Sequence, residues 1–275
     1  MNADFMYGML MAFVDYVPGK ALWECEFVGL THFASFITNP NFFNLLRNTL
    51  VMSTLMLTIG FIAPIIFALL LTEIRRPGAK KVVQTCSYLP HFISWIVAGS
   101  MVYNLLSAEG VINKFLVNQG WIDQAIPFLT EGKYYWVIYL IVNIWKGIGW
   151  SAIIYLSAIS GVDGSLYEAG SLDGLGHFGR VWHITIPSIL PTIILLFIMS
   201  IGDILNAGFD YHLIIGNSST MAYWDVLDTY TYRYGIQEGL YSMSVAVSLM
   251  KSVIGFALVL GANKLSKKFG DAALF

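Results

Sequence analysis

Four polar side chains lie inside long apolar stretches and are the residues best placed to act on a polar solute. Asn143, Lys146, Asp203 and Lys251 each interrupt a run of mainly hydrophobic residues. Such groups are costly in a membrane, so they normally face a bundle interior or a water-filled path. We therefore predict that these four residues line a path for a polar solute. For Lys146 and Lys251 an alternative stays open, which is a structural ion pair or a side chain reaching the membrane surface.

Aromatic and amide side chains near these residues extend the predicted path, because they can contact a polar solute through ring faces and hydrogen bonds. The residues added to the predicted substrate path are Trp95, Tyr103, Asn104, Trp145 and Asn206. Trp150 and Tyr155 are further aromatic candidates. Tryptophan and tyrosine also gather at membrane interfaces, which is the alternative for each aromatic residue. Asn104 has the alternative of a hydrogen bond between helices.

The sequence offers no chemistry of an enzyme acting alone. It contains no Gly-x4-Gly-Lys-[Ser/Thr] phosphate loop, so ATP is expected to bind elsewhere. It shows no nucleophile–base set, and two cysteines and five scattered histidines predict no metal site. The net charge of -2 gives no footprint for nucleic acid. We predict no cofactor, metal or nucleic-acid partner for this chain.

Five membrane-spanning helices are predicted to position these residues. Of the 275 residues, 57% are hydrophobic and 12% are charged, whereas soluble domains carry about 25% charged residues. A spanning helix needs about 20 mainly apolar residues. The runs that qualify are Thr49–Thr72, Thr85–Leu106, Tyr134–Ser160, Ile184–Leu205 and Met243–Ala262. Phe5–Val14 is shorter and is predicted to be an interfacial or packed helix. The expected fold is an all-α, polytopic membrane helix bundle.

The positions of lysine and arginine set the predicted orientation. Four basic residues lie between the first two spans, and three follow the last span, so both segments are assigned to the cytoplasm. Residues 1–48 are then extracytoplasmic, residues 49–262 form the membrane domain, and the loop 161–183 and the tail 263–275 are cytoplasmic. Five spans ending inside require an external N-terminus without an export signal. We therefore expect that a first helix preceding Met1 is missing from this sequence.

An acidic, glycine-containing stretch interrupts the apolar sequence between the third and fourth predicted spans. Ser165 and Glu168 fit a capping box, which predicts a short helix from Ser165 to about Asp173. Gly174 and Gly176 are predicted to end this helix, because glycine tolerates the backbone of a helix C-terminus. Pro187 fits the first turn of the next span, where no N–H group is needed.

The spacing of this stretch resembles the EAA motif of binding-protein-dependent ABC importer permeases. That motif reads Glu-Ala-Ala, three residues, Gly, nine residues, Ile, one residue and Leu-Pro. This sequence has Glu168-Ala169-Gly170, then Gly174, then Ile184 and Ile186-Pro187 at the same separations, with Gly170 and Ile186 as departures. The stretch "VNIWKGIGW" resembles the carbohydrate-uptake branch of these permeases. The stretches "VLDTYTYRYGI" and "ANKLSKKFG" resemble the first permease type of its oligosaccharide and polysaccharide subgroup. The segment "YHLIIGNSSTMAYW" departs from the usual spacing of that subgroup.

The resemblance implies the transmembrane domain of a type I ABC importer in a bacterial cytoplasmic membrane. Such a chain imports oligosaccharides or polysaccharide fragments as one permease of a heterodimer. Its implied partners are a second homologous permease, two ATPase subunits that bind ATP and Mg²⁺, an extracytoplasmic solute-binding protein, the carbohydrate and membrane lipid. The implied ATPase-coupling residues are Glu168, Ala169, Gly170, Leu172, Asp173, Gly174 and Pro187.

Two other functions are weighed against this one. An ion-coupled secondary transporter of a small polar solute is suggested by Lys146, Asp203 and Lys251 within the membrane. Many such transporters show internal repeats, and this sequence has none that we find. A membrane-bound enzyme would need a catalytic cluster, which the sequence does not show.

Overall fold

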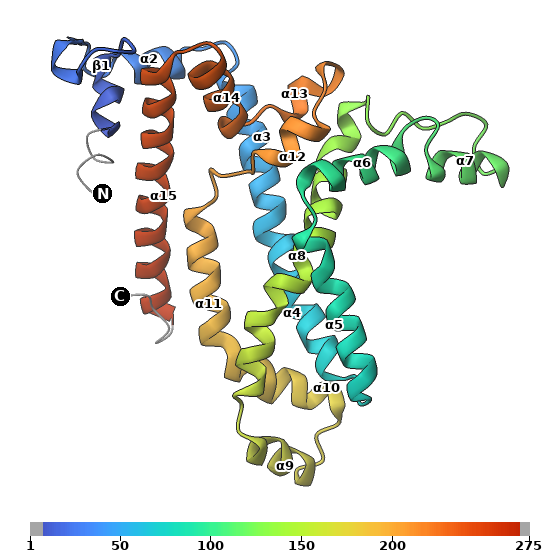
Figure 1. The fold of residues 1–275 in the computed structure, drawn as a ribbon. Coiled ribbons are helices and arrows are strands. Elements are labelled where there is room, and N and C mark those ends of the chain that lie inside the picture. Colours follow the sequence, from blue (N-terminus) through green and yellow to red (C-terminus); the bar gives the residue numbers. More distant parts are fainter. Residues whose placement is uncertain (1–7, 270–275) are drawn as a thin grey trace. The chain divides into compact units, whose positions relative to one another are not determined.

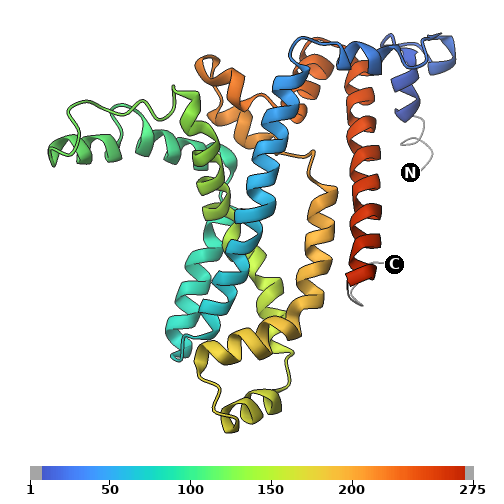
Figure 2. The same cartoon turned by 180° about the vertical axis from the view of Figure 1, so that it is seen from behind.

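The computed structural model describes residues 8–269, whose regular secondary structure is almost entirely helical (Figures 1 and 2). The α-helices are α2 (Thr31–Ile37), α3 (Phe42–Leu55), α4 (Phe61–Thr72), α5 (Pro77–Phe92), α6 (Trp95–Leu106), α7 (Val111–Asn118), α8 (Tyr135–Ser160), α9 (Gly164–Leu172), α10 (His177–Arg180), α11 (Ile186–Gly202), α12 (Asp210–Ile215), α13 (Met221–Trp224), α14 (Leu227–Tyr232) and α15 (Tyr241–Phe269). The 3-10 and π segments are η1 (Leu10–Phe13), η2 (Leu22–Glu24), η3 (Met56–Gly60), η4 (Gly132–Tyr134), η5 (Val181–Thr185), η6 (Ser218–Thr220) and η7 (Arg233–Gln237). Strands β1 (Val14–Asp15) and β2 (Glu26–Phe27) pair antiparallel. The predicted all-α class is confirmed.

Five helical stretches of the described chain are long and apolar enough to cross a membrane. They are Phe42–Thr72, Trp95–Asn118, Gly132–Ser160, His177–Gly202 and Tyr241–Lys267. Four of them contain or closely match four predicted spans, which are therefore confirmed. The predicted helix Phe5–Val14 lies partly outside the described residues, and within them Gly8 and Met9 are α-helical and η1 follows them before β1. The predicted tail 263–275 also extends beyond them, although α15 continues to Phe269.

The second predicted span, Thr85–Leu106, is wrong as a single helix. Helix α5 ends at Phe92, Ile93 has an extended backbone, and α6 begins at Trp95. Two local causes act here. Pro90 cannot donate a backbone hydrogen bond near the end of α5, and the Ser94 hydroxyl accepts a hydrogen bond from the Val97 N–H at 3.3 Å. Ser94 thus starts a new helix in the manner of an N-cap residue.

The chain divides into two compact units, and each unit consists of three segments that alternate with those of the other unit along the sequence. Unit 1 consists of residues 8–54, 99–137 and 202–258, and unit 2 consists of residues 55–98, 138–201 and 259–269. Each unit has its own apolar core. In unit 1 the core contains Phe36, Leu45, Leu227, Tyr230 and Val247, so α2, α3, α14 and α15 meet there. Figure 1 shows α14 between α3 and the start of α15.

Polar side chains in the middle of α3 hold the segment before α14 in unit 1. The amide of buried Asn48 donates to the backbone oxygens of Ala222 and Asp225, at 3.0 and 2.9 Å. The Thr49 hydroxyl accepts from the Leu227 N–H at 3.1 Å. The segment "YHLIIGNSSTMAYW" therefore leads into a packed part of unit 1, because buried backbone groups need such partners.

Buried His212 ties α12 to the start of α8 within unit 1. Its Nε2 lies 3.1 Å from the backbone oxygen of Ala207, so Nε2 carries the proton. Its Nδ1 lies 2.9 Å from the Tyr135 hydroxyl and accepts from it. His212 is 0% exposed, and burial lowers the pKa of its ring from 6.5 to about 4. The neutral ring is therefore the form that the fold requires.

We expect acid to destabilise unit 1 through His212. The unfolded chain binds a proton at His212 below about pH 6.5, whereas the folded chain does so only near pH 4. The stabilisation is therefore complete above pH 6.5 and falls by roughly 3 kcal/mol as the pH drops to 4. Thermal unfolding between pH 7.5 and 5 measures this slope. His212→Gln, which keeps one donor and one acceptor, should flatten it, and an unchanged slope in this variant would contradict the assignment.

Unit 2 is built around α4, α8 and α11. Ala68 of α4 packs with Ala152 and Tyr155 of α8, and side chains of α11 cover this cluster. The Phe61 ring meets the rings of Tyr155 and Phe197 edge to face, with centroids 6.4 and 5.2 Å away. Figures 1 and 2 show α9 at one end of unit 2, beyond the ends of α8 and α11. This end carries the stretch that resembles the EAA motif.

Candidate functional site

The N-cap residue of helix α9 lies two residues earlier than the sequence predicts. This residue is Asp163, whose carboxylate accepts a hydrogen bond from the Ser165 N–H at 2.9 Å. This hydrogen bond lowers the pKa of the Asp163 carboxyl group. The predicted capping box of Ser165 and Glu168 is therefore wrong, because aspartate is an equally good cap and stands at the end of the preceding turn. Glu168 lies in the middle of α9 and is exposed.

The end of α9 matches the prediction that Gly174 terminates the helix. The Leu175 N–H donates to the Gly170 oxygen at 2.8 Å, and the Gly174 N–H donates to the Ser171 oxygen at 3.2 Å. These two bonds define a Schellman motif, in which the residue after the C-cap adopts a left-handed backbone. Gly174 has a φ of +80°, as this motif requires. The chain thus turns sharply from α9 toward α10.

We expect Gly174→Ala to loosen the end of α9, because a side chain in the left-handed region costs about 1–2 kcal/mol. Amide exchange at Leu175, whose N–H closes the motif, should accelerate by roughly 5- to 30-fold. Gly176→Ala is the matched control, since Gly176 has a φ of -66° and an added methyl group meets nothing within 4 Å. Equal protection of Leu175 in both variants would show that Gly174 does not hold the turn.

One side of α9 packs against the helix that follows it. Gly170 is buried, and a methyl group at this position would lie 2.7 Å from Cδ1 of Ile184. The Tyr167 hydroxyl lies 3.0 Å from the hydroxyl of buried Thr185. The Arg180 guanidinium donates to the Ser171 hydroxyl at 3.3 Å. α9, α10 and η5 therefore form one packed segment, named here the α9–η5 segment.

The other side of the α9–η5 segment carries solvent-exposed apolar side chains. Leu172 is 91% exposed and Phe178 is 88% exposed. Glu168, Ala169 and Asp173 are also exposed. Large apolar residues gathered on one exposed segment are typical of interaction sites. The five residues named in this paragraph are called the docking residues below.

The α9–η5 segment continues into α11 without a break. The helix runs from His177 to Gly202, with the π segment η5 between α10 and α11. Pro187 lies in the first turn of α11, as predicted, and η5 runs directly into that turn. Pro187 has no backbone N–H group that could donate to the preceding turn of the helix. The π segment η5 forms that preceding turn. A displacement of α10 thus reaches α11 directly.

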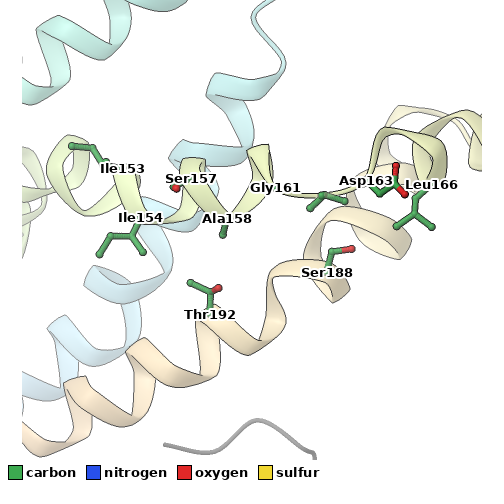
Figure 3. A pocket seen from close by; sticks show the side chains of 10 residues that line it. Ile153, Ile154, Ser157, Ala158, Gly161, Asp163, Leu166, Ser188 and Thr192 are labelled. Carbon is green, nitrogen blue, oxygen red and sulfur yellow. The ribbon is translucent and has the colours of Figure 1, made fainter.

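An ion pair and a groove complete this end of unit 2. His177, at the start of α10, pairs with Glu73, which follows α4, a contact that sequence spacing could not reveal. A groove of about 710 Å³ opens between the end of α8, the start of α9 and α11. Figure 3 shows Ser188 and Thr192 of α11 along one side and Ser157 of α8 along the other. A movement of α9 toward α11 would narrow this groove.

The predicted substrate-path residues of unit 2 fall into two groups. Lys146 is buried, and its ammonium lies 5.2 Å from the centroid of the Trp95 ring, so these two come together. Asn143 donates to the Tyr139 oxygen of its own helix at 2.8 Å, and Trp145 is partly exposed.

The predicted substrate-path residues of unit 1 are also separated. The Asn206 amide donates to the Asp203 carboxylate at 3.1 Å, and both side chains are exposed. Tyr103 and Asn104 are exposed on α6. Lys251 forms an ion pair with Asp228, with 10% and 21% of the two side chains exposed. Lys251 thus has the structural partner that the sequence left open as an alternative.

The described part of the chain shows no cluster of side chains suited to a metal ion. Between residues 8 and 269, no group of three or more His, Cys, Asp or Glu side chains is placed to hold a metal ion. The exposed apolar and acidic side chains of the α9–η5 segment are of the kind found at protein interaction sites.

Known proteins resemble this chain over nearly its whole length. The family described as "Binding-protein-dependent transport system inner membrane component" matches residues 60–270. Protein LplB of Bacillus subtilis is 44% identical over 98% of this chain and 85% of that protein. The polygalacturonan/rhamnogalacturonan transport system permease protein YteP of the same organism is 42% identical over 98% of this chain and 84% of that protein. A chain in the crystal structure of a bacterial alginate ABC transporter, in complex with alginate pentasaccharide-bound periplasmic protein, superposes with a TM-score of 0.89 at 35% identity, covering 99% of this chain and 90% of that chain.

Proposed function

The chain belongs to the family of binding-protein-dependent transport system inner membrane components, and we propose that it is a permease subunit of an ATP-driven importer of oligosaccharides or polysaccharide fragments. It is a multi-pass membrane protein with five helical stretches able to span the bilayer. The observation that carries the proposal is the α9–η5 segment. Its buried side packs α9 against η5, which continues into α11, while Leu172 and Phe178 are exposed on the other side.

The substrate class is proposed from the relatives. The solved structures belong to a transporter of the acidic polysaccharide alginate, and YteP is named for polygalacturonan and rhamnogalacturonan. Oligosaccharides of such polymers are therefore the first substrates to test. The ion-coupled alternative finds no support in this family.

The partners follow from the same proposal. A second, homologous permease would complete the membrane path, and an extracytoplasmic solute-binding protein would deliver the carbohydrate. Two ATPase subunits would bind ATP and Mg²⁺ and receive the docking residues. The Glu168 carboxylate suits a charge-assisted hydrogen bond from an arginine of the ATPase, and Leu172 suits an apolar cleft. Membrane lipid would surround the spans.

The segment explains how ATP hydrolysis would move the membrane domain. Closure of the ATPase pair displaces the docking residues. The contacts of Gly170 with Ile184 and of Tyr167 with Thr185 pass this displacement to η5. Because η5 continues directly into α11, the movement enters the bilayer along one helix. Rigid elements with close packing transmit such shifts with little loss.

Copurification followed by an activity assay tests the proposal. The chain is coexpressed with its candidate partner subunits and reconstituted, and ATP hydrolysis is measured with the solute-binding protein and defined oligosaccharides. We expect an ATPase to copurify and oligosaccharides of alginate or polygalacturonan to stimulate hydrolysis more than neutral ones do. Recovery without any ATPase, or uptake that follows an ion gradient and ignores ATP, would overturn it.

A further inference from the structure

The stretch "VNIWKGIGW", residues 142–150 of α8, has no part in the docking of the α9–η5 segment. Three of its residues, Lys146, Gly149 and Trp150, contact the last two turns of α5 in unit 2. There α5 stops at Phe92 and α6 starts at Trp95, in the apolar run that the sequence predicts to be unbroken. The role of these three residues follows from what each one contacts.

Lys146 provides hydrogen-bond donors for the backbone carbonyl groups at the end of α5. Its ammonium donates to the backbone oxygens of His91 and Pro90, at 2.8 and 3.3 Å. The last carbonyl groups of a helix have no partner within the helix, and hydrocarbon offers none. A cation also suits the negative end of the helix dipole. The same ammonium lies 5.2 Å from the Trp95 ring centroid, so Lys146 contacts both sides of the break.

Gly149 lets the two helices approach closely. A methyl group at this position would lie 2.2 Å from the backbone oxygen of Ser87 and 2.5 Å from its carbonyl carbon. Both atoms belong to the backbone of α5, so the conflict could be relieved only by moving the helices apart. Small residues serve this purpose where membrane helices pack backbone to backbone.

Trp150 covers the last turn of α5 one helical turn beyond Lys146. Its ring stacks on the His91 ring with centroids 4.5 Å apart and planes 1° apart. Phe92 meets the same indole edge to face at 6.0 Å. Residues four apart on a helix share one face, so the ammonium and the indole act on the same turn of α5.

We propose that Lys146, Gly149 and Trp150 form a clasp that ends α5 at Phe92 and sets the position of the Trp95 ring. Lys146 is thus a positioning residue, and its burial is explained without contact to a transported sugar. The inference goes beyond the proposed function and does not depend on it, because the clasp consists of contacts within unit 2.

Two glycines of the same helix give a matched test. Gly149→Ala should lower the midpoint of thermal unfolding of the full chain, purified in the assembly it forms, by at least about 5 °C. Gly147→Ala is the control, because a methyl group there meets nothing within 4 Å. Alanine favours a helix over glycine, so this control should keep or raise the midpoint. Equal midpoints for both variants would overturn the clasp.

A distance measurement tests Lys146 separately. Spin labels at the exposed positions Val82 of α5 and Val97 of α6 report the geometry across the break. We expect Lys146→Met to broaden or shift this distance distribution and Lys146→Arg to keep it narrow. An unchanged distribution in Lys146→Met would overturn the proposal, whether or not transport is lost. Since neither readout requires transport, failure here is distinct from failure of the proposed importer function.

Discussion

Leu172→Asp should abolish ATP-driven uptake while the chain still folds and inserts into the membrane. Leu172 is 91% exposed, so the substitution removes almost no contact within the chain. In the proposed complex this side chain is buried in the ATPase, where an unpaired carboxylate carries a large desolvation penalty. A loss of about 3–4 kcal/mol in docking corresponds to a reduction of roughly 100- to 1,000-fold in affinity.

The measurement is the amount of ATPase that copurifies with the chain, together with uptake by reconstituted vesicles. Leu172→Met is the control, because it keeps an apolar side chain of similar volume, and it should behave as the unchanged protein. The thermal midpoint of the chain should be the same in all three proteins. Undiminished copurification and uptake with Leu172→Asp would remove the α9–η5 segment from the docking interface.

The spans could be predicted from the sequence because their signal is local. Runs of about 20 apolar residues, such as Thr49–Thr72, must be helical in a bilayer, where every backbone group needs a partner. The break after Phe92 could not be predicted in this way, because the mean hydropathy of a run carries no information about where its backbone hydrogen bonds are interrupted. Pro90 and Ser94 were visible in the sequence, but the cation that satisfies the end of α5 comes from Lys146 on a distant helix.

In the α9–η5 segment, too, some features could be predicted from the sequence and others could not. Gly174 could be assigned from its spacing, because the end of a short helix calls for a residue with positive φ. The N-cap residue of α9 could not be assigned from the sequence, because aspartate and serine are both preferred at this position. Only the backbone conformation decides for Asp163 over Ser165. The close approach of Gly170 to Ile184 depends on how two segments pack. Resemblance to the family pointed to the candidate site, and the packing shows how α9 is held against η5.

Lys251→Met should destabilise unit 1 by about 3–5 kcal/mol, because it removes one partner of a mostly buried ion pair. The Asp228 carboxylate would then lose its cation. Its second oxygen is already buried without a hydrogen-bond partner among the residues that the structure describes. The measurement is the unfolding free energy of the full chain, or the shift of its thermal midpoint, at neutral pH.

The double variant Lys251→Met with Asp228→Asn decides between the two roles that the sequence leaves open for Lys251. If the lysine only neutralises Asp228, removing both charges should restore most of the lost stability, because no uncompensated charge stays buried. Uptake should then recover in parallel with stability. If Lys251 instead lines the substrate path, the double variant would be stable and still fail to transport. That outcome would show that Lys251 lines the substrate path and that its ion pair with Asp228 does not serve stability alone.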